Sequence, residues 1–144
     1  MRWALLALLV ASGAHAQRQP GWEVRVPDKI ELATGASGTV AVSIAVDRGL
    51  SVSRDADVIL DVVPDPGLTV RKKRLGRRDA VDPEADAPRF AIPVRADADG
   101  EHTVKLRVRF WVCGGKVCKP IDVRRTATVA VTAPAPAPPD AGVD

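Results

Sequence analysis

The sequence has little of the chemistry that most metal sites and nucleophilic active sites use. Its 144 residues include only two histidines, two cysteines and no tyrosine. His102 is the one histidine beyond the first sixteen residues, whereas zinc sites usually take four ligands. The serines lie in strand-like and turn-like stretches without a nucleophile elbow, so Ser/His/Asp catalysis has no support. We therefore expect no metal ion and no cofactor.

The chain also lacks a strong charge of either sign. Its formal net charge is +3, which does not indicate a nucleic-acid partner. The apolar run from Ala4 to Ala11 is far too short to cross a bilayer, and no later segment is long and apolar enough. We expect no membrane span in the mature chain.

The start of the chain has the parts of a secretory signal in their usual order. Arg2 gives a positive start, the apolar run follows, and the Ala-His-Ala sequence at 14–16 is a small-x-small cleavage site. We predict that residues 1–16 form a signal peptide that is cut after Ala16. The mature protein would then be periplasmic or secreted, where disulfides can form.

Helix signals are nearly absent after the signal, and strand signals are frequent. The strongest strand signal extends from His102 to Val112, where apolar residues alternate with Lys105, Arg107, Arg109 and Trp111. Turn-forming clusters separate about seven to nine short strands. This pattern predicts an all-β fold, an antiparallel immunoglobulin-like β-sandwich with a disulfide-bearing hairpin. The expected strands are 22–26, 40–46, 57–63, 68–71, 90–95, 102–112 and 123–132.

We assign residues 17–132 to the sandwich domain and residues 133–144 to a disordered tail rich in proline and alanine. Residues 73–88 read as one long polar loop. A loop of this length is either a solvated, mobile segment or a functional one, here a flap that faces a partner near the cysteines.

The most specific chemistry is the pair Cys113 and Cys118, on either side of an expected loop at 114–117. Residues that flank a hairpin loop lie opposite each other, about 4.5 to 5.5 Å apart, and a disulfide accepts that spacing. So small a ring stabilises by roughly 2 kcal/mol in the loop-entropy model. Lys116 and Lys119 bring positive charge that favours thiolate. The residues alone leave a structural disulfide and a redox-active pair both open. The C-x4-C spacing is unusual for zinc, and the absence of C-x-x-C excludes a thioredoxin-type site.

The segment 112–120, Val-Cys-Gly-Gly-Lys-Val-Cys-Lys-Pro, resembles the periplasmic amino-terminal domain of the thiol:disulfide interchange protein DsbD. Residues 66–70 and 90–94, on either side of the long loop, also resemble the middle of that family. The resemblance covers Trp22 to Thr132. It implies an immunoglobulin-like sandwich whose cysteine pair takes electrons from a thioredoxin-like partner and passes them to periplasmic oxidoreductases.

By this resemblance, Cys113 and Cys118 are the catalytic exchanging pair, and Cys118 is the sulfur that is attacked. The residues expected to shape or shield the loop around them are Trp111, Gly114, Gly115, Lys116 and Pro120. The chain departs from the family where Ile121 follows Pro120, since many members have a second proline. The membrane electron-transporting domain of the family is also missing. A thioredoxin-like or membrane thiol reductant would therefore be a separate partner, and periplasmic disulfide oxidoreductases would be the acceptors.

These observations lead to one leading hypothesis and one alternative. The leading hypothesis is an exported thiol:disulfide exchange domain that relays electrons between periplasmic redox proteins through one cysteine pair. Such reductase-like activity would depend on a partner reductant. The alternative is a non-catalytic β-sandwich binding module in which a structural hairpin disulfide stiffens a recognition loop.

Overall fold

A computed structural model describes residues 21–134 of the chain. The predicted signal peptide and residues 135–144 of the predicted tail lie outside the described residues. Ten strands and one short 3-10 helix make up the described part. They are β1 (Trp22–Arg25), β2 (Lys29–Ala33), β3 (Ser37–Val46), β4 (Ser51–Val52), β5 (Ile59–Pro64), β6 (Leu68–Thr69), β7 (Arg74–Leu75), η1 (Arg77–Asp79), β8 (Arg89–Ala96), β9 (Gly100–Gly114) and β10 (Val117–Thr132).

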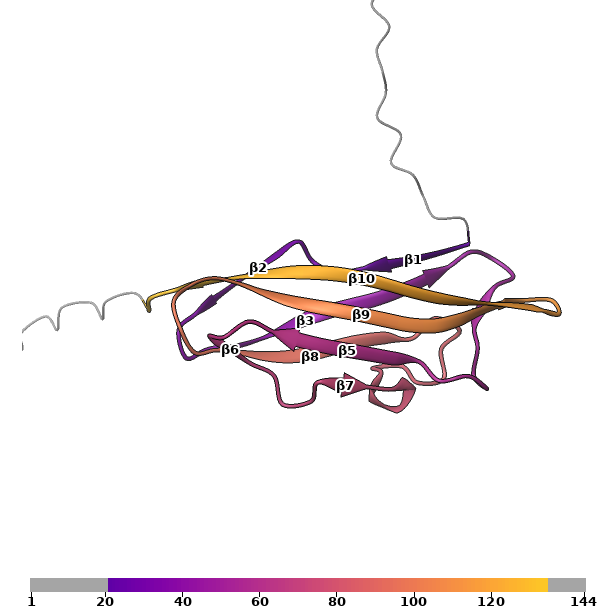
Figure 1. The fold of residues 1–144 in the computed structure, drawn as a ribbon, viewed down its shortest axis with the longest axis horizontal. Helices are drawn as coiled ribbons and strands as arrows, with labels where there is room; N and C mark the ends of the chain where they lie inside the picture. The colour runs from indigo at the N-terminus through magenta and orange to yellow at the C-terminus, as the bar shows by residue number, and fades with distance from the viewer. Residues whose placement is uncertain (1–20, 135–144) are drawn as a thin grey trace, which may run out of the picture.

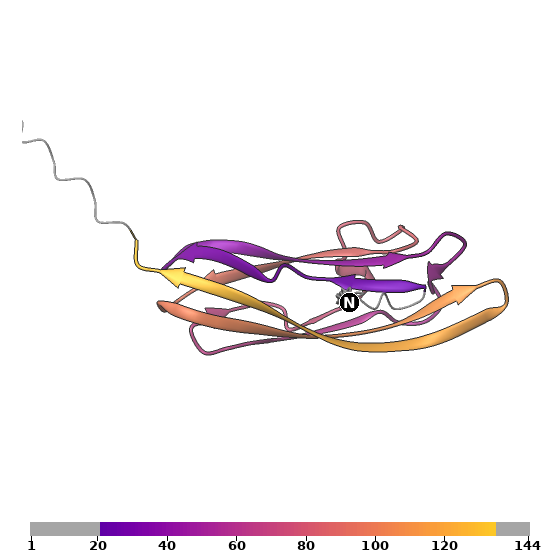
Figure 2. The same cartoon turned by 90° about the horizontal axis from the view of Figure 1, so that it is seen from above.

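The strands form two sheets that face each other, which confirms the predicted all-β sandwich. One sheet has the order β1-β3-β8-β6, and the other has the order β2-β10-β9-β5-β7, with β4 also paired to β9. Figure 1 shows the strands along the long axis of the molecule, and Figure 2 shows the two layers from above. All strand pairs are antiparallel except β2 with β10, which is parallel.

The period of two in β9 decides which of its side chains enter the core. Its five alternating apolar residues are all buried, whereas Lys105 and Trp111 on the other face are exposed. The same alternation buries three residues of β10. The buried residues of these two strands are Val104, Leu106, Val108, Phe110, Val112, Ala127, Val129 and Val131. The stripe on β9 agrees with the alternation identified in the sequence.

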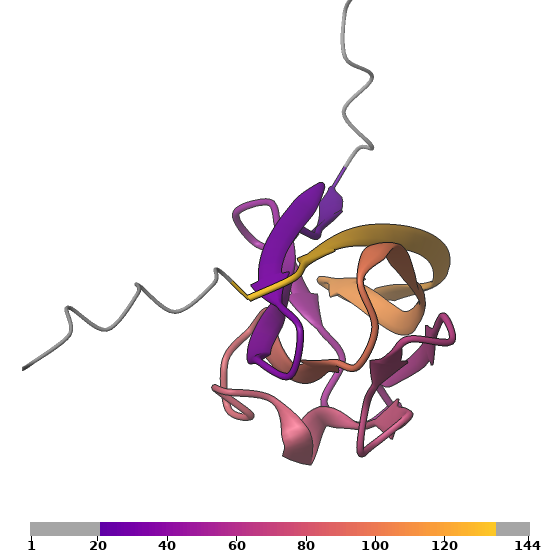
Figure 3. The same cartoon turned by 90° about the vertical axis from the view of Figure 1, so that its left-hand side faces the viewer.

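The N-terminal strand divides between the two sheets. β1 pairs with β3 in one sheet, Pro27 interrupts the chain, and β2 then pairs with β10 in the other. The end-on view in Figure 3 shows these indigo strands beside the yellow C-terminal strand. Because β2 covers β10 only at Thr128–Thr132, the outer edge of β10 nearer the hairpin turn has no partner strand among the described residues.

Arg125 closes part of this open edge. Its Nε donates a hydrogen bond to the Val24 carbonyl at 3.0 Å, and its Nη1 donates to the Arg124 carbonyl at 2.9 Å. One guanidinium group therefore satisfies a carbonyl of β1 and a carbonyl of β10. It links the two sheets where no strand does.

The segment 73–88 contains β7 and η1 and is held in place by its own side chains. The Arg77 guanidinium donates hydrogen bonds to four backbone carbonyls at 2.9 to 3.2 Å. Leu75 and Ala80 are buried in the core. The expectation of a solvated loop is therefore wrong, because the arginine and two apolar residues anchor the segment to the sandwich. The acceptor carbonyls belong to Val52, Ser53, Pro83 and Ala85.

Candidate functional site

The end of the β9–β10 hairpin extends beyond the neighbouring strands (Figure 1). Gly114 pairs with Val117, so the turn consists only of Gly115 and Lys116. Gly115 has a φ of 60°, and glycine at the first central position is typical of a type II′ hairpin turn. The predicted four-residue loop is thus a two-residue turn. The tight turn extends the β9–β10 ladder past the cysteines.

Cys113 and Cys118 are joined by a disulfide, and they lie directly opposite each other as predicted. Their Cα atoms are 4.1 Å apart. That short spacing is typical of an antiparallel pair that does not exchange backbone hydrogen bonds. On the other side of β9, Ser51 of β4 pairs with Cys113. The disulfide therefore crosses the hairpin between strands that are already paired.

The hairpin end is seated on Leu50, which sequence reasoning did not single out. A Cβ at Gly114 would overlap the Cδ2 methyl group of Leu50, so glycine permits this close approach. Leu50 also lines an apolar groove of about 300 Å³ together with Trp22, Val117 and Ile121. Near this groove, Trp22 packs edge-on against Phe110 with ring centroids 6.0 Å apart. The role of Leu50 is visible only in the folded chain, because it depends on the contact between Leu50 and Gly114.

The opposite face of the hairpin carries an exposed tryptophan. Trp111 is 41% exposed and pairs across the strands with Pro120, which is also exposed. A shallow cavity of about 420 Å³ runs beside them and is lined in part by Ile59 and Arg109. Val117 at the turn, on the groove side of the hairpin, is 60% exposed. Two of the large apolar side chains that the sandwich leaves exposed thus lie on this hairpin end.

Ion pairs border the Trp111 face on the side away from the turn. Arg107 contacts Asp122 at 2.6 Å, and Arg109 contacts Asp61 at 2.7 Å. The hydrogen bond from Arg107 lowers the pKa of Asp122 below its ordinary value. The pKa of Asp61 is also lowered, first by its hydrogen bond from Arg74 and further by Arg109. These carboxylates stay charged at neutral pH and keep the arginine side chains paired.

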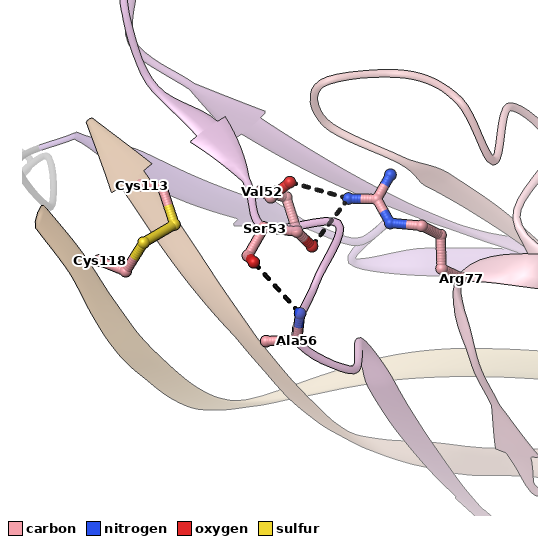
Figure 4. Close-up of a disulfide and its surroundings, with 6 residues drawn as sticks. All are labelled: Val52, Ser53, Ala56, Arg77, Cys113 and Cys118. Atoms are coloured by element: carbon pink, nitrogen blue, oxygen red, sulfur yellow. Dashed lines mark hydrogen bonds between the residues drawn. A yellow bond between two sulfur atoms is a disulfide. The ribbon is translucent and has the colours of Figure 1, made fainter. Parts of the chain in front are cut away.

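The structure brings the predicted site residues together at one end of the molecule. Lys116 lies in the turn, and Lys119 is exposed on β10. The segment 73–88 does not cover them. Figure 4 shows Arg77 on the far side of the Val52–Ser53 segment from the disulfide. The interpretation of this segment as a flap over the cysteines is therefore wrong, since its arginine is committed to other carbonyls.

Within residues 21–134, no polar or charged residue is fully buried, and no cluster of three His, Cys, Asp or Glu side chains could hold a metal ion. No helix in this range is long and apolar enough to cross a membrane. The disulfide agrees with an exported protein. The geometry at the hairpin end supplies an exposed aromatic surface on a rigid support.

No protein-family model and no curated protein matches this chain. Among solved structures, it is similar to AggA, the major subunit of aggregative adherence fimbriae type I from Escherichia coli. That match has 11% identity and a TM-score of 0.37, and it covers 82% of this chain and all of AggA. The chain is also similar to the CooA pilin subunit of enterotoxigenic Escherichia coli. Here the identity is 11%, the TM-score is 0.30, and the match covers 78% of this chain and 99% of CooA.

These comparisons correct the family prediction. No family model supports the DsbD resemblance, and the matching structures reported above are fimbrial subunits rather than DsbD domains. The predicted thiol relay is therefore wrong, and so are its redox partners, a thiol reductant and periplasmic disulfide oxidoreductases. The sequence signal was misleading because glycines between opposed cysteines, followed by proline, suit any tight disulfide-bearing hairpin. The exchange role given to Cys113 and Cys118 came with that resemblance, and we do not keep it.

Proposed function

We propose that this chain is a non-catalytic β-sandwich binding module that recognises a protein partner with the end of its β9–β10 hairpin. The observation that carries the proposal is the combination at that end of an exposed Trp111 with a cross-strand disulfide directly beside it. Tryptophan is enriched among residues that dominate binding energy, because it buries a large apolar area. The disulfide limits the motion of both strands, so little conformational entropy is lost on binding.

The rest of the hairpin supports the same role. The ladder between β9 and β10 continues to the turn, and Leu50 packs under Gly114 at its base. The recognition surface is therefore part of the sheet rather than a separate loop. Sites built on strands hold their side chains in fixed positions more accurately than loops do.

The proposal places this module outside the cytoplasm. Residues 1–16 direct export and are removed after Ala16, and residues 17–132 form the binding domain in the periplasm or the surrounding medium. The support is the order of signal features in the sequence together with a disulfide that needs an oxidising compartment.

A site-specific photo-crosslinking experiment tests the proposed recognition surface. A photoreactive amino acid replaces Trp111 or Val117 in the full chain, expressed in its own cells. Matched controls replace Ala41 or Ala91, which lie opposite each other and exposed on the outer face of the other sheet. We expect both hairpin positions to capture the same protein and both control positions to capture none. Equal capture from all four positions, or none from the hairpin, would overturn the proposal.

A second arm separates recognition from thiol chemistry. The same crosslinker at Val117 is combined with Cys113→Ser and Cys118→Ser. A recognition hairpin should still capture the partner, though less efficiently, because the strands gain motion that binding must remove. Complete loss of capture in a variant that is folded by circular dichroism would show that the sulfur atoms themselves are required.

A further inference from the structure

The face of the hairpin around Trp111 has a definite chemical character. Register places Trp111 and Pro120 side by side, with Ile59, Arg109 and Asp122 next to them on the same side of the sheet. These five residues border the cavity of about 420 Å³. An indole next to a proline ring gives a flat, rigid, apolar surface, and aromatic-lined grooves of this kind dock proline-rich segments in the polyproline II conformation.

The Trp111 indole also has a free donor. Its N–H makes no hydrogen bond with any group in the described part of the chain. A polyproline II segment makes no internal hydrogen bonds and keeps its carbonyl groups available. An indole N–H beside an apolar groove is suited to donate to such a carbonyl while the ring packs against proline.

The charge on this side of the sheet is mixed and largely paired. The charged residues that line the cavity are Arg109, Asp57 and Asp122. Arg107 contacts Asp122, and Arg109 contacts Asp61. The character of this face therefore comes from its apolar surface and its free indole donor.

The chain itself contains a segment with the matching chemistry. Residues 133–139 read Ala-Pro-Ala-Pro-Ala-Pro-Pro, and Asp140 and Asp144 follow. The segment 133–144 has four prolines, two acidic residues and no basic residue. Repeated proline favours polyproline II. Its prolines complement an aromatic face that offers a free hydrogen-bond donor.

The same chain cannot place this segment on its own Trp111 face. Thr132 lies twelve residues along β10 from Pro120, which is about 40 Å at 3.3 Å per residue. Residues 133–139 span only about 22 Å as polyproline II. Figure 1 shows β10 ending at the opposite end of the molecule from the hairpin turn. A segment of this kind on the Trp111 face would therefore have to come from a second copy.

We infer that the Trp111 face binds the proline-rich segment 133–144 of a second copy of this chain, so that copies associate end to end. This inference rests on the proposed recognition role of the hairpin and names its partner. The contact is heterologous, because the two copies contribute different surfaces, and such contacts produce open chains unless they close into a ring.

Two measurements test the inference on the exported chain. Sedimentation velocity over a range of protein concentrations reports self-association of residues 17–144. A synthetic peptide of residues 132–144 is then titrated onto the same protein while tryptophan fluorescence is recorded. We expect concentration-dependent association that the peptide inhibits, with a change in the Trp111 emission on peptide binding.

Variants locate both surfaces. Trp111→Ala should weaken peptide binding at least about tenfold, as expected when a central aromatic anchor is truncated. Replacing the four prolines 134, 136, 138 and 139 with glycine should reduce self-association to a similar extent, because it leaves the length and charge of the segment unchanged. The matched control is Val63→Ala. Val63 is 61% exposed and lies at the end of β5 away from Ile59. Its truncation should change neither peptide binding nor self-association.

A protein that stays monomeric at all concentrations and does not bind the peptide would overturn the inference. Peptide binding that persists unchanged in Trp111→Ala would overturn it as well, since the site would lie elsewhere. Failure here is distinguishable from failure of the proposed function. If Trp111 and Val117 crosslink a different protein while the peptide does not bind, the hairpin remains a recognition element with another partner.

Discussion

The segment 73–88 and the end of the β9–β10 hairpin use their side chains in opposite ways. The segment 73–88 is rich in charge, yet its main arginine is bonded inward to four carbonyls. The hairpin end carries two large apolar side chains, Trp111 and Val117, yet both are exposed. Polar composition therefore marks an anchored region here, and apolar composition marks the surface that is open to a partner. What decides the role is whether the fold offers each side chain an internal partner.

The largest effect should come from breaking the anchor of the segment 73–88. Arg77→Ala removes four hydrogen bonds from a charged donor and leaves partly buried carbonyls unsatisfied. We expect the free energy of unfolding in urea to fall by about 2–4 kcal/mol. Arg77→Lys should lower the free energy of unfolding by a smaller amount, because an ammonium group replaces only part of the planar guanidinium's set of donors. The control is the exposed neighbour Arg78→Ala, with a change within about 0.5 kcal/mol. If both alanine variants cost the same, the segment is not anchored through Arg77.

The disulfide should contribute less than this single arginine. We expect Cys113→Ser with Cys118→Ser to leave a folded sandwich and to lower the free energy of unfolding by about 2 kcal/mol, since the ring it opens is small. Urea unfolding followed by circular dichroism measures the difference. A double variant that is unfolded at room temperature would show that the hairpin end supports the whole sandwich and would reverse the comparison.

Acid should weaken the anchoring of the segment 73–88. The Lys72 ammonium group and the Gly76 amide hydrogen-bond to Asp79 and lower the pKa of its carboxyl. The amide of Arg89 does the same for Asp82. A lowered folded-state pKa means that this stabilisation is present above the unfolded value near 4 and is lost as the pH falls through the folded value. We expect stability to decline below about pH 4, and Asp79→Asn to decline less steeply. An equally steep decline in the variant would assign the acid sensitivity to other groups.

The smallest change in stability should follow removal of the most conspicuous surface residue. Trp111→Ala deletes an exposed side chain on the outer face of the sheet, so we expect the free energy of unfolding to change by about 0.5 kcal/mol or less. The measurement is again urea unfolding, compared with the loss of peptide binding in the same protein. A large destabilisation would mean that Trp111 is part of the structural framework, and the contrast between the two regions would then disappear.

The sequence predicted the strands that carry strong alternation and missed those set by the rest of the fold. The stripe from Val104 to Val112 was identifiable because a period of two over a long segment has one structural meaning. β2, β4 and β7 are short, and each depends on a neighbour: β2 on β10, β4 on β9, and β7 on β5. Their pairing comes from tertiary contacts that no local pattern encodes.

The site was predicted in position and misread in chemistry. The opposed placement of Cys113 and Cys118 followed from hairpin geometry alone. Their role depended on what surrounds them, and the local motif is shared by structural and reactive disulfides. The contact of Leu50 with Gly114 and the bonds of Arg77 link positions that are distant in sequence. Such contacts determine which surface is rigid and exposed, and they appear only once the chain is folded.

The open edge of β10 bears on how the protein behaves when it is concentrated. An unpaired strand edge can add strands from other molecules in a templated way and so start amyloid-like growth. Pro120 lies two residues along β10 from Cys118, so its nitrogen faces the same edge of the strand as that of Cys118. Because proline has no N–H, this position provides no hydrogen-bond donor at the open edge. The Arg125 guanidinium already occupies the carbonyl of Arg124 and places a charge beside it. The edge that the divided N-terminal strand leaves uncovered is thus a poor template, and the exported protein should resist fibril formation at high local concentration.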